Sequence, residues 1–184
     1  MRVIAGTHKG RRLQAPTWSG LRPTSDRLRE TLFDILAPRV VGARVLDVYA
    51  GTGAIGIEAL SRGAASAVFV EQDRRARALI ARNLAHCGIA EGCAIIQSSA
   101  ERALDELRAR GAAFDLILLD PPYADSDTQI TTVLTPSAAL LAPDGLVVLE
   151  HARRRQLPTR IGPLAQTRLV AAGDSALAFY AWQP

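Results

Sequence analysis

Residues 44–56 read Arg-Val-Leu-Asp-Val-Tyr-Ala-Gly-Thr-Gly-Ala-Ile-Gly, and this stretch decides the fold. Its apolar first half predicts a buried strand. Gly51, Gly53 and Gly56 then have the spacing of a glycine turn that leads from a strand into a helix. Glu71 follows Gly51 by 20 residues, at the end of the next predicted strand, where an acid can accept hydrogen bonds from ribose hydroxyls. The stretch therefore predicts a strand–turn–helix unit that binds a nucleoside cofactor.

From residue 44 onward, apolar strand-like segments alternate with segments of helical periodicity. This alternation predicts the α/β class, with a mostly parallel sheet covered by helices on both faces and an antiparallel last strand pair at one edge. The most apolar strand, residues 114–120, is expected near the centre, and Pro38 is expected to end the first helix. Helices are expected from Thr24 to Pro38, over 54–61, 73–87 and 101–110, and, with Pro136 as a potential break, over most of 126–141. Strands are expected over 44–50, 67–72, 93–97, 114–120, 145–150 and, as a pair joined near Gly173 and Asp174, within 164–182.

Length and composition exclude several classes of protein. The 184 residues form one domain, which we divide into a basic N-terminal hairpin appendage (1–20) and a core (21–184). A hydrophobic share of 48% with 22% charged residues excludes wholesale disorder. No apolar run approaches the ~18 residues of a membrane span, and the apolar start is too short for a signal peptide. With two cysteines and no zinc-like spacing, we expect no metal, no membrane and a cytoplasmic location.

The positive charge is concentrated near the N-terminus. Residues 1–44 hold nine Lys or Arg against three acidic residues, a net of +6, whereas the remaining 13 basic and 15 acidic residues give −2. Such a skew is typical of a protein that grips a polyanion at one end, although a solvated arginine-rich surface is the alternative. The basic residues on the predicted hairpin are Arg2, Lys9, Arg11 and Arg12.

The acids near the glycine turn bear on the choice of cofactor. A pyrophosphate favours a helix N-terminus with no carboxylate nearby, yet Asp47 precedes the turn and Asp120 ends the most apolar strand. S-adenosylmethionine has a sulfonium, an ammonium and one carboxylate, so its net charge is positive and suits these acids better. The charges favour this cofactor without excluding a dinucleotide.

The sequence Asp120-Pro121-Pro122-Tyr123 predicts the chemistry at the end of that strand. Two prolines fix an extended corner and remove two backbone donors. The Asp120 carboxylate and the Pro121 carbonyl then form an acceptor pair for the two hydrogens of an exocyclic amine, and Tyr123 offers a face on which a base can stack. Acceptors outside the ring plane would draw the amine nitrogen towards tetrahedral geometry and make its lone pair available for attack on a methyl group.

With these two motifs, the chain resembles S-adenosylmethionine-dependent amino-methyltransferases of nucleic acids. Further segments, spread along almost the whole chain, are similar to the bacterial guanine-N2 methyltransferases of small-subunit (16S) ribosomal RNA: residues 1–6, 9–13, 21–30, 56–64 and 173–177. The resemblance implies a seven-stranded Rossmann-like methyltransferase with an N-terminal β-hairpin that approaches RNA. It also implies a monomer acting on 16S ribosomal RNA within the small subunit or its precursor, with S-adenosylhomocysteine as product and no metal.

The resemblance assigns roles residue by residue. Asp120, Pro121, Pro122 and Tyr123 are expected to act in catalysis, and Arg2, Lys9, Arg11 and Arg12 to bind RNA. The expected cofactor-binding residues are Arg22, Thr24, Asp47, Ala50, Gly51, Thr52, Gly53, Glu71, Ser99 and Asp120.

Two positions depart from the family pattern. Many relatives have an acid after the third strand that meets the cofactor adenine, but residues 97–100 contain none here, which leaves Ser99 or the backbone for that contact. The family often has Tyr before the late Gly-Asp pair, where this chain has Ala172, so no stacking role is expected there.

Three other functions compete with this interpretation. An adenine-N6 or cytosine-N4 DNA methyltransferase would share the catalytic residues, but this small chain lacks a separate domain to read a DNA sequence. An NAD-dependent oxidoreductase would explain the glycine turn and Glu71 but not Asp120-Pro121-Pro122-Tyr123. A non-catalytic RNA-binding assembly factor would explain the basic N-terminus but not the intact acceptor motif.

Overall fold

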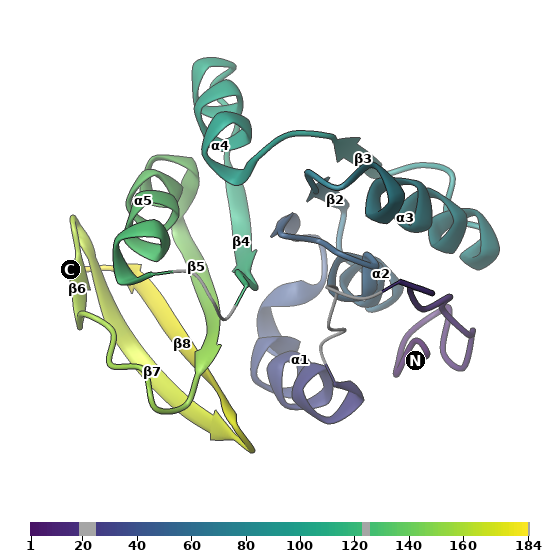
Figure 1. Cartoon of the computed structure of the whole chain (residues 1–184), viewed down its shortest axis with the longest axis horizontal. Coiled ribbons are helices and arrows are strands. Elements are labelled where there is room, and N and C mark those ends of the chain that lie inside the picture. The colour runs from purple at the N-terminus through teal and green to yellow at the C-terminus, as the bar shows by residue number, and fades with distance from the viewer. Residues whose placement is uncertain (19–24, 123–125, 184) are drawn as a thin grey trace.

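The computed structural model describes residues 1–18, 25–122 and 126–183 (Figure 1). Within these residues the sheet has eight strands in the order β3-β2-β1-β4-β5-β8-β7-β6. The strands are β1 (Arg44–Val48), β2 (Ser66–Val70), β3 (Cys93–Ile96), β4 (Phe114–Leu119), β5 (Leu141–Ala152), β6 (Arg160–Ile161), β7 (Leu164–Ala172) and β8 (Ser175–Trp182). The helices are α1 (Asp26–Val40), α2 (Ala54–Ser61), α3 (Arg74–Cys87), α4 (Ala100–Ala109), α5 (Asp127–Ser137) and the short 3-10 helix η1 (Ala138–Leu140).

The predicted α/β class is confirmed. Strands β3, β2, β1, β4 and β5 pair in parallel, and β8 and β7 continue the sheet in antiparallel fashion. The predicted central position of residues 114–120 is also correct, because β4 lies between β1 and β5. Strand β6 was not predicted from the sequence. It pairs with β7 through two residues only, so it cannot be distinguished from a loop by its pattern.

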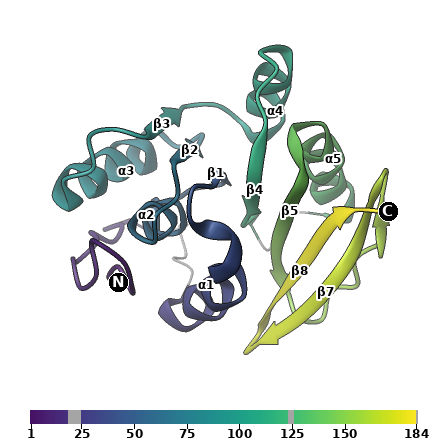
Figure 2. The same cartoon turned by 180° about the vertical axis from the view of Figure 1, so that it is seen from behind.

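Helices cover both faces of the sheet, as Figures 1 and 2 show. On one face α1, α2 and α3 bury residues such as Phe33, Ile57 and Ile80 against the sheet. On the other face α4 and α5 bury Leu104 and Val133. Apolar residues of β4 alternate between the two clusters, so the strand is buried on both sides. This accounts for its continuous apolar sequence.

Some predicted boundaries differ from those of the structure. Helix α1 includes Pro38 and ends at Val40, because a proline in the last turn removes only one hydrogen bond and its fixed φ suits a helix. Over 126–141 the expected break is observed, because α5 ends at Ser137, just after Pro136, and gives way to η1. Strand β5 begins at Leu141 instead of Gly145, because Leu141 pairs with Phe114 across an irregular register.

The third glycine of the motif permits close packing between α2 and β2. A Cβ atom on Gly56 would lie 2.3 Å from Cε1 of Phe69, an aromatic ring that is fully buried in β2. Any larger residue would push the helix off the sheet. The glycine therefore sets the distance between the helix and the strand, and with it the position of the turn that precedes the helix.

The first 18 residues, which we name the N-terminal arm, pack against the core. Arg2 and Arg12 form an antiparallel bridge, and the neighbouring Val3 and Leu13 are buried in the same apolar cluster as α1 and α2. The carboxylate of Glu58, which is fully buried in α2, accepts the amide hydrogens of Ile4 (2.7 Å) and Ala5 (3.0 Å). The predicted hairpin thus has one bridge and further backbone hydrogen bonds between its two segments, such as that from the Val3 amide to the Arg11 carbonyl at 3.0 Å, and α2 attaches it to the core.

Two arginines complete the attachment of the arm. Arg62 pairs with Glu58 at 2.7 Å. Arg29, fully buried in α1, donates to the carbonyl of Arg2 at 2.7 Å and to the Asp26 carboxylate at 2.8 Å. Loss of water around its guanidinium lowers the pKa of Arg29, an effect that the charges of Asp26 and Glu58 partly offset. The arm is therefore held by buried, charge-assisted hydrogen bonds.

Candidate active site

Sheet topology brings the two predicted motifs to one edge. The chain leaves β1 towards β2 and β3, then crosses back to place β4 on the other side of β1. Ligands of open α/β sheets bind at this kind of reversal, beyond the carboxyl ends of the strands. Val48 and Leu119 are register partners, so the glycine turn after β1 and Asp120 after β4 begin side by side. The amide of Asp120 donates to the carbonyl of Val48 at 3.4 Å.

The glycine turn needs left-handed backbone at two of its glycines. Gly51 has φ 56° and Gly53 has φ 77°, values that cost glycine little. Tyr49 also has a positive φ, 65°, which is uncommon for a residue with a side chain. The amide of Gly53 donates to the carbonyl of Ala50 at 2.7 Å, and Ala50 donates to Val70 of β2. The turn is thus tightly closed and joined to the neighbouring strand.

Glu71, predicted to hold ribose, braces this turn. One carboxylate oxygen accepts the amide hydrogen of Gly51 at 2.9 Å, and the other accepts that of Asp73 at 2.8 Å. The side chain thereby connects the loop after β1 to the loop after β2, and only 8% of the residue is exposed. A carboxylate has about four acceptor positions, so these two bonds also orient it towards a further donor.

Asp47 lies beneath the turn in the interior. It is 1% exposed, and its Oδ2 accepts the amide hydrogen of Gly56 at 2.9 Å. Burial, together with the smaller effect of the Glu71 charge, raises the pKa of Asp47 to about 7, although the Gly56 hydrogen bond acts in the opposite direction. Its burial and its bond to Gly56 point to a positioning role, in which it holds the start of α2.

Thr52 connects the glycine turn to the N-terminal arm through a residue that the sequence did not single out. Its carbonyl accepts from the side-chain amide of Asn83 at 2.9 Å. The same Asn83 amide group, fully buried in α3, bonds both the amide (2.8 Å) and the carbonyl (3.2 Å) of Gln14. The Thr52 hydroxyl also lies 3.8 Å from the sulfur of Met1. An isolated Asn in a helix gives no sequence signal for such a role.

Ser99 follows β3 and caps α4. Its hydroxyl accepts the amide hydrogen of Arg102 at 3.5 Å, a common function of serine at this position. It lies at the same carboxyl edge as the glycine turn. A contact of Ser99 with the cofactor adenine stays a prediction.

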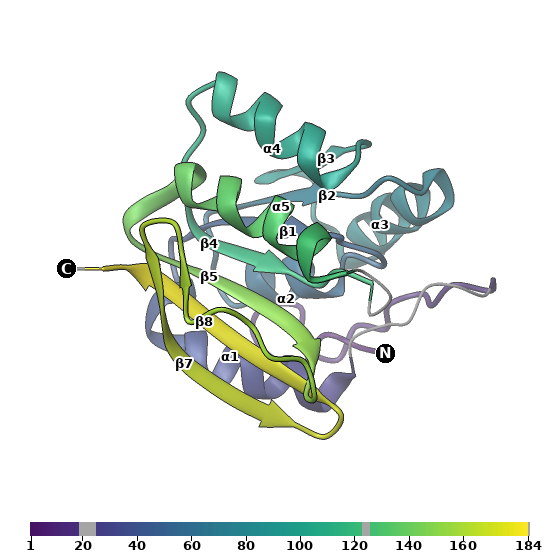
Figure 3. The same cartoon turned by 60° about the vertical axis from the view of Figure 1, so that its left-hand side comes forward.

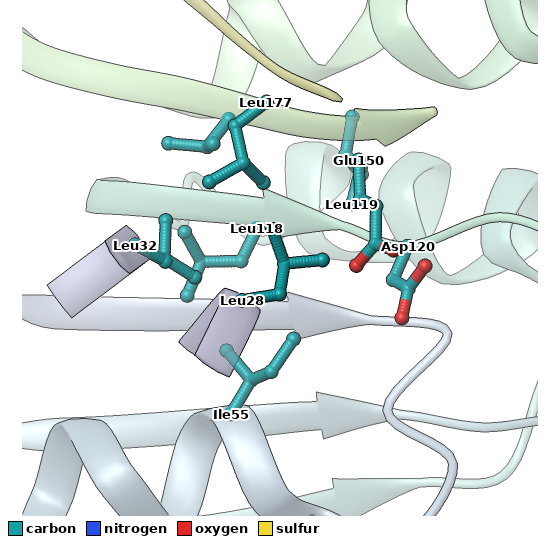
Figure 4. A pocket seen from close by; sticks show the side chains of 9 residues that line it. Leu28, Leu32, Ile55, Leu118, Leu119, Asp120, Glu150 and Leu177 are labelled. Atoms are coloured by element: carbon teal, nitrogen blue, oxygen red, sulfur yellow. The ribbon is translucent and has the colours of Figure 1, made fainter. Parts of the chain in front are cut away.

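Asp120 lines a pocket at the end of β4, shown in Figure 4. The walls are mostly apolar, and a second carboxylate, Glu150 of β5, lies on the same side as Asp120. Sequence reasoning placed Glu150 at a strand end but gave it no function. Pro121 is buried and Pro122 exposed. The predicted site residues Tyr123, Arg22 and Thr24 lie outside the described residues.

The predicted RNA-binding residues are all exposed on the arm. The turn of the arm lies at the far end of α2, because the amide of Thr7 donates to the carbonyl of Ser61. Arg11 donates to the carbonyl of His86, near the end of α3, at 3.0 Å. The N-terminus itself lies on the side to which the arrows of β4 and β5 point (Figure 3). The arm therefore runs from the carboxyl edge along α2, with Lys9 and Arg11 away from that edge.

Metal-ligand clusters and membrane-spanning helices are both absent from the described residues. In the part of the chain that the structure describes, no three His, Cys, Asp or Glu residues gather as ligands for a metal ion. Among these same residues, no helix has the length and apolar character to cross a bilayer.

Comparison with known proteins identifies the family. The family model described as Conserved hypothetical protein 95 matches residues 1–181. The chain belongs to this family. One relative is the Escherichia coli (strain K12) protein named Ribosomal RNA small subunit methyltransferase D. It is 38% identical to this chain, and the match covers 98% of this chain and 89% of the relative. YlbH of Bacillus subtilis (strain 168), named as a putative rRNA methyltransferase, is 38% identical over 98% of both chains. The solved structure of yhhF from Escherichia coli has a TM-score of 0.84 at 32% identity, covering 100% of this chain and 98% of its own. The family resemblance inferred from the sequence is confirmed.

The raised pKa of Asp47 predicts that the free energy of unfolding of this protein depends on pH. Asp47 is ionised in the unfolded chain above its ordinary pKa of 3.8 but resists ionisation in the folded state up to about 7. The folded state therefore binds more protons in this window, so the free energy of unfolding falls as pH rises from about 4 to 7. Asp47→Asn keeps an acceptor for Gly56 without the charge. Relative to the wild type, its free energy of unfolding should rise by about 2–3 kcal/mol between pH 5 and pH 8.

Urea unfolding at a series of pH values measures this difference. Asp34→Asn, a change at an exposed position of α1, serves as the control and should track the wild type. A constant stability difference between Asp47→Asn and the wild type across this range would show that Asp47 has no raised pKa.

Proposed function

We propose that this protein transfers a methyl group from S-adenosylmethionine to the exocyclic N2 amine of a guanine in 16S ribosomal RNA. The observation that supports it most is the position of Asp120 and Pro121 beside the glycine turn, at the reversal of the sheet. Full-length similarity to a protein named Ribosomal RNA small subunit methyltransferase D supports ribosomal RNA as the substrate class. Action on the small subunit or its precursor, by a cytoplasmic monomer, belongs to the same proposal.

The residues around the turn fit the charge of this cofactor. Three carboxylates, those of Asp47, Glu71 and Asp120, surround the end of β1. They would attract a net positive ligand and repel a pyrophosphate. In the proposal Glu71 holds the ribose hydroxyls, the backbone of Ala50, Gly51, Thr52 and Gly53 approaches the ligand closely, and Ser99 or nearby backbone meets the adenine. Arg22 and Thr24 are assigned to the cofactor pocket by resemblance alone.

Asp120 and Pro121 would act on the amine. The bound cofactor supplies an electrophilic methyl group on a positively charged sulfur. The Asp120 carboxylate and the Pro121 carbonyl accept the two amine hydrogens and turn the nitrogen lone pair out of the base plane. The new N–C bond forms as the C–S bond breaks and its electron pair stays on sulfur, and the amine proton leaves through Asp120 to water. Tyr123 and Pro122 would pack against the base, and such contacts count only as far as they favour the transition state.

Removal of the Asp120 carboxylate tests the chemistry separately from binding. Incubation with labelled S-adenosylmethionine and 30S particles or their RNA, followed by mapping of the base, should give N2-methylguanine with the wild type. Asp120→Ala should lower the methyl-transfer rate ~100-fold or more with little change in cofactor affinity, because its contacts strengthen in the transition state. Asp105→Ala, on the exposed side of α4, is the matched control. A different methylated base, or near-normal turnover by Asp120→Ala, would contradict the proposal.

The basic residues of the arm make a separate prediction about RNA. Replacement of Lys9, Arg11 and Arg12 by Ala should change stability little, since exposed charges contribute only ~0–1 kcal/mol each. RNA affinity should fall, and the slope of log affinity against log salt should flatten by about 0.7–0.9 for each phosphate that is no longer neutralised. S-adenosylmethionine binding should be unchanged.

A triple variant on the opposite face provides the control for this experiment. Arg102 and Arg108 are exposed on α4 and Arg110 is exposed directly after it, and their replacement by Ala removes the same charge. Equal decreases of RNA affinity in the two triple variants would show that only net charge matters, and an unchanged salt slope for the arm variant would show that the arm is solvated surface.

A further inference from the structure

Glu150 is placed to act on the same base as Asp120. Leu119 and Leu149 are register partners in the parallel strands β4 and β5, so the next residue of each strand, Asp120 and Glu150, stands at the same height. Both line one pocket, and Figure 4 shows their carboxylate groups side by side. The remaining walls are hydrocarbon, contributed among others by Leu28, Ile55 and Leu177.

The neighbourhood of Glu150 fixes its orientation. The residue is 8% exposed and its Oε1 accepts the hydroxyl hydrogen of Ser175 at 3.1 Å. Ser175 begins β8, directly after the turn formed by Gly173 and Asp174, and its neighbour Ala176 pairs with His151 of β5. A buried carboxylate is costly unless something stabilises it, and a hydrogen-bonded carboxylate next to an apolar pocket is typical of a site that recognises a polar group.

We propose that Glu150 accepts the N1–H of the target guanine while Asp120 accepts hydrogen from the adjacent N2 amine. This proposal rests on the proposed function and explains its choice of base. The Watson–Crick edge of guanine presents two neighbouring donors, N1–H and the N2 amine, which match two neighbouring carboxylates. Adenine and cytosine also have an exocyclic amine, but the ring nitrogen beside it is an acceptor whose lone pair would face the Glu150 carboxylate. The two carboxylates therefore select guanine by binding its two donors and by repelling the ring acceptor of adenine or cytosine.

The apolar walls suit this arrangement. Leucine and isoleucine side chains border the two carboxylates, so the edge of a base that reaches these carboxylates meets them beside hydrocarbon and not in open water. In a poorly hydrated pocket, a hydrogen bond to a charged group is worth more than in water, and a mismatched lone pair costs more. Discrimination by Glu150 thus depends on its burial as well as on its charge.

A base analogue tests this role directly. 2-Aminopurine keeps the 2-amino group of guanine but has an acceptor at N1. In an RNA that the wild type methylates, the mapped guanine is replaced by 2-aminopurine, and kcat/KM is measured for both RNAs. The wild type should strongly prefer guanine. Glu150→Gln, whose amide can donate to N1, should lose about 10- to 100-fold on guanine and lower the guanine to 2-aminopurine ratio at least 10-fold.

Three further measurements separate the possible failures. Glu150→Asp, which keeps the charge but withdraws the acceptor from N1, should also lose activity on guanine and lower the guanine to 2-aminopurine ratio, so the test survives if Glu150→Gln fails to fold. Glu106→Gln, at an exposed position of α4, should match the wild type on both RNAs. If the wild-type product is N2-methylguanine and the ratio is unchanged in Glu150→Gln, the role of Glu150 is overturned alone. A wild-type product other than N2-methylguanine overturns the proposed function, and this inference with it.

Discussion

The carboxylate of Glu71 receives the amide hydrogens of Gly51 and Asp73, and the candidate cofactor site depends on this bridge. The loops after β1 and β2 each leave the sheet with unpaired backbone donors, and a buried acid between them satisfies two of these at once. The left-handed glycines let the first loop turn sharply enough to reach it. Gly56 then allows α2 to pack on Phe69 at the distance that keeps the turn in place.

Buried polar side chains also attach the N-terminal arm to the candidate site. Glu58 binds two arm amides from the middle of α2, and Asn83 bonds both Gln14 and the glycine-turn carbonyl of Thr52. An arm that bound RNA would thus be rigidly connected to the turn that is proposed to hold the cofactor. The charges that would contact phosphate are exposed, whereas the groups that attach the arm are buried.

The sequence predicted the features that local patterns encode. The glycine spacing, the apolar β4 and the strand-end acids specified the sheet, its helices and the edge where Asp120 lies. Features that depend on distant partners could not be predicted. Nothing near Asn83 or Glu58 in the chain reveals a bond to residues more than 50 positions away, and Glu150 gains its place beside Asp120 only from the pairing of β4 with β5. The prediction that Pro38 ends the first helix was wrong because a helix tolerates proline in its last turn more readily than in its middle.

The most direct test is of the claim that one carboxylate both braces the glycine turn and holds the cofactor. Calorimetric titration of S-adenosylhomocysteine into the wild type, Glu71→Ala and the exposed control Glu91→Ala measures it. The account predicts that Glu71→Ala weakens binding by about 1–3 kcal/mol, the cost of losing charge-assisted hydrogen bonds. It also predicts that Glu91→Ala binds like the wild type and that NAD gives no heat of binding. Unchanged affinity in Glu71→Ala, or tight binding of NAD to the wild type, would contradict it.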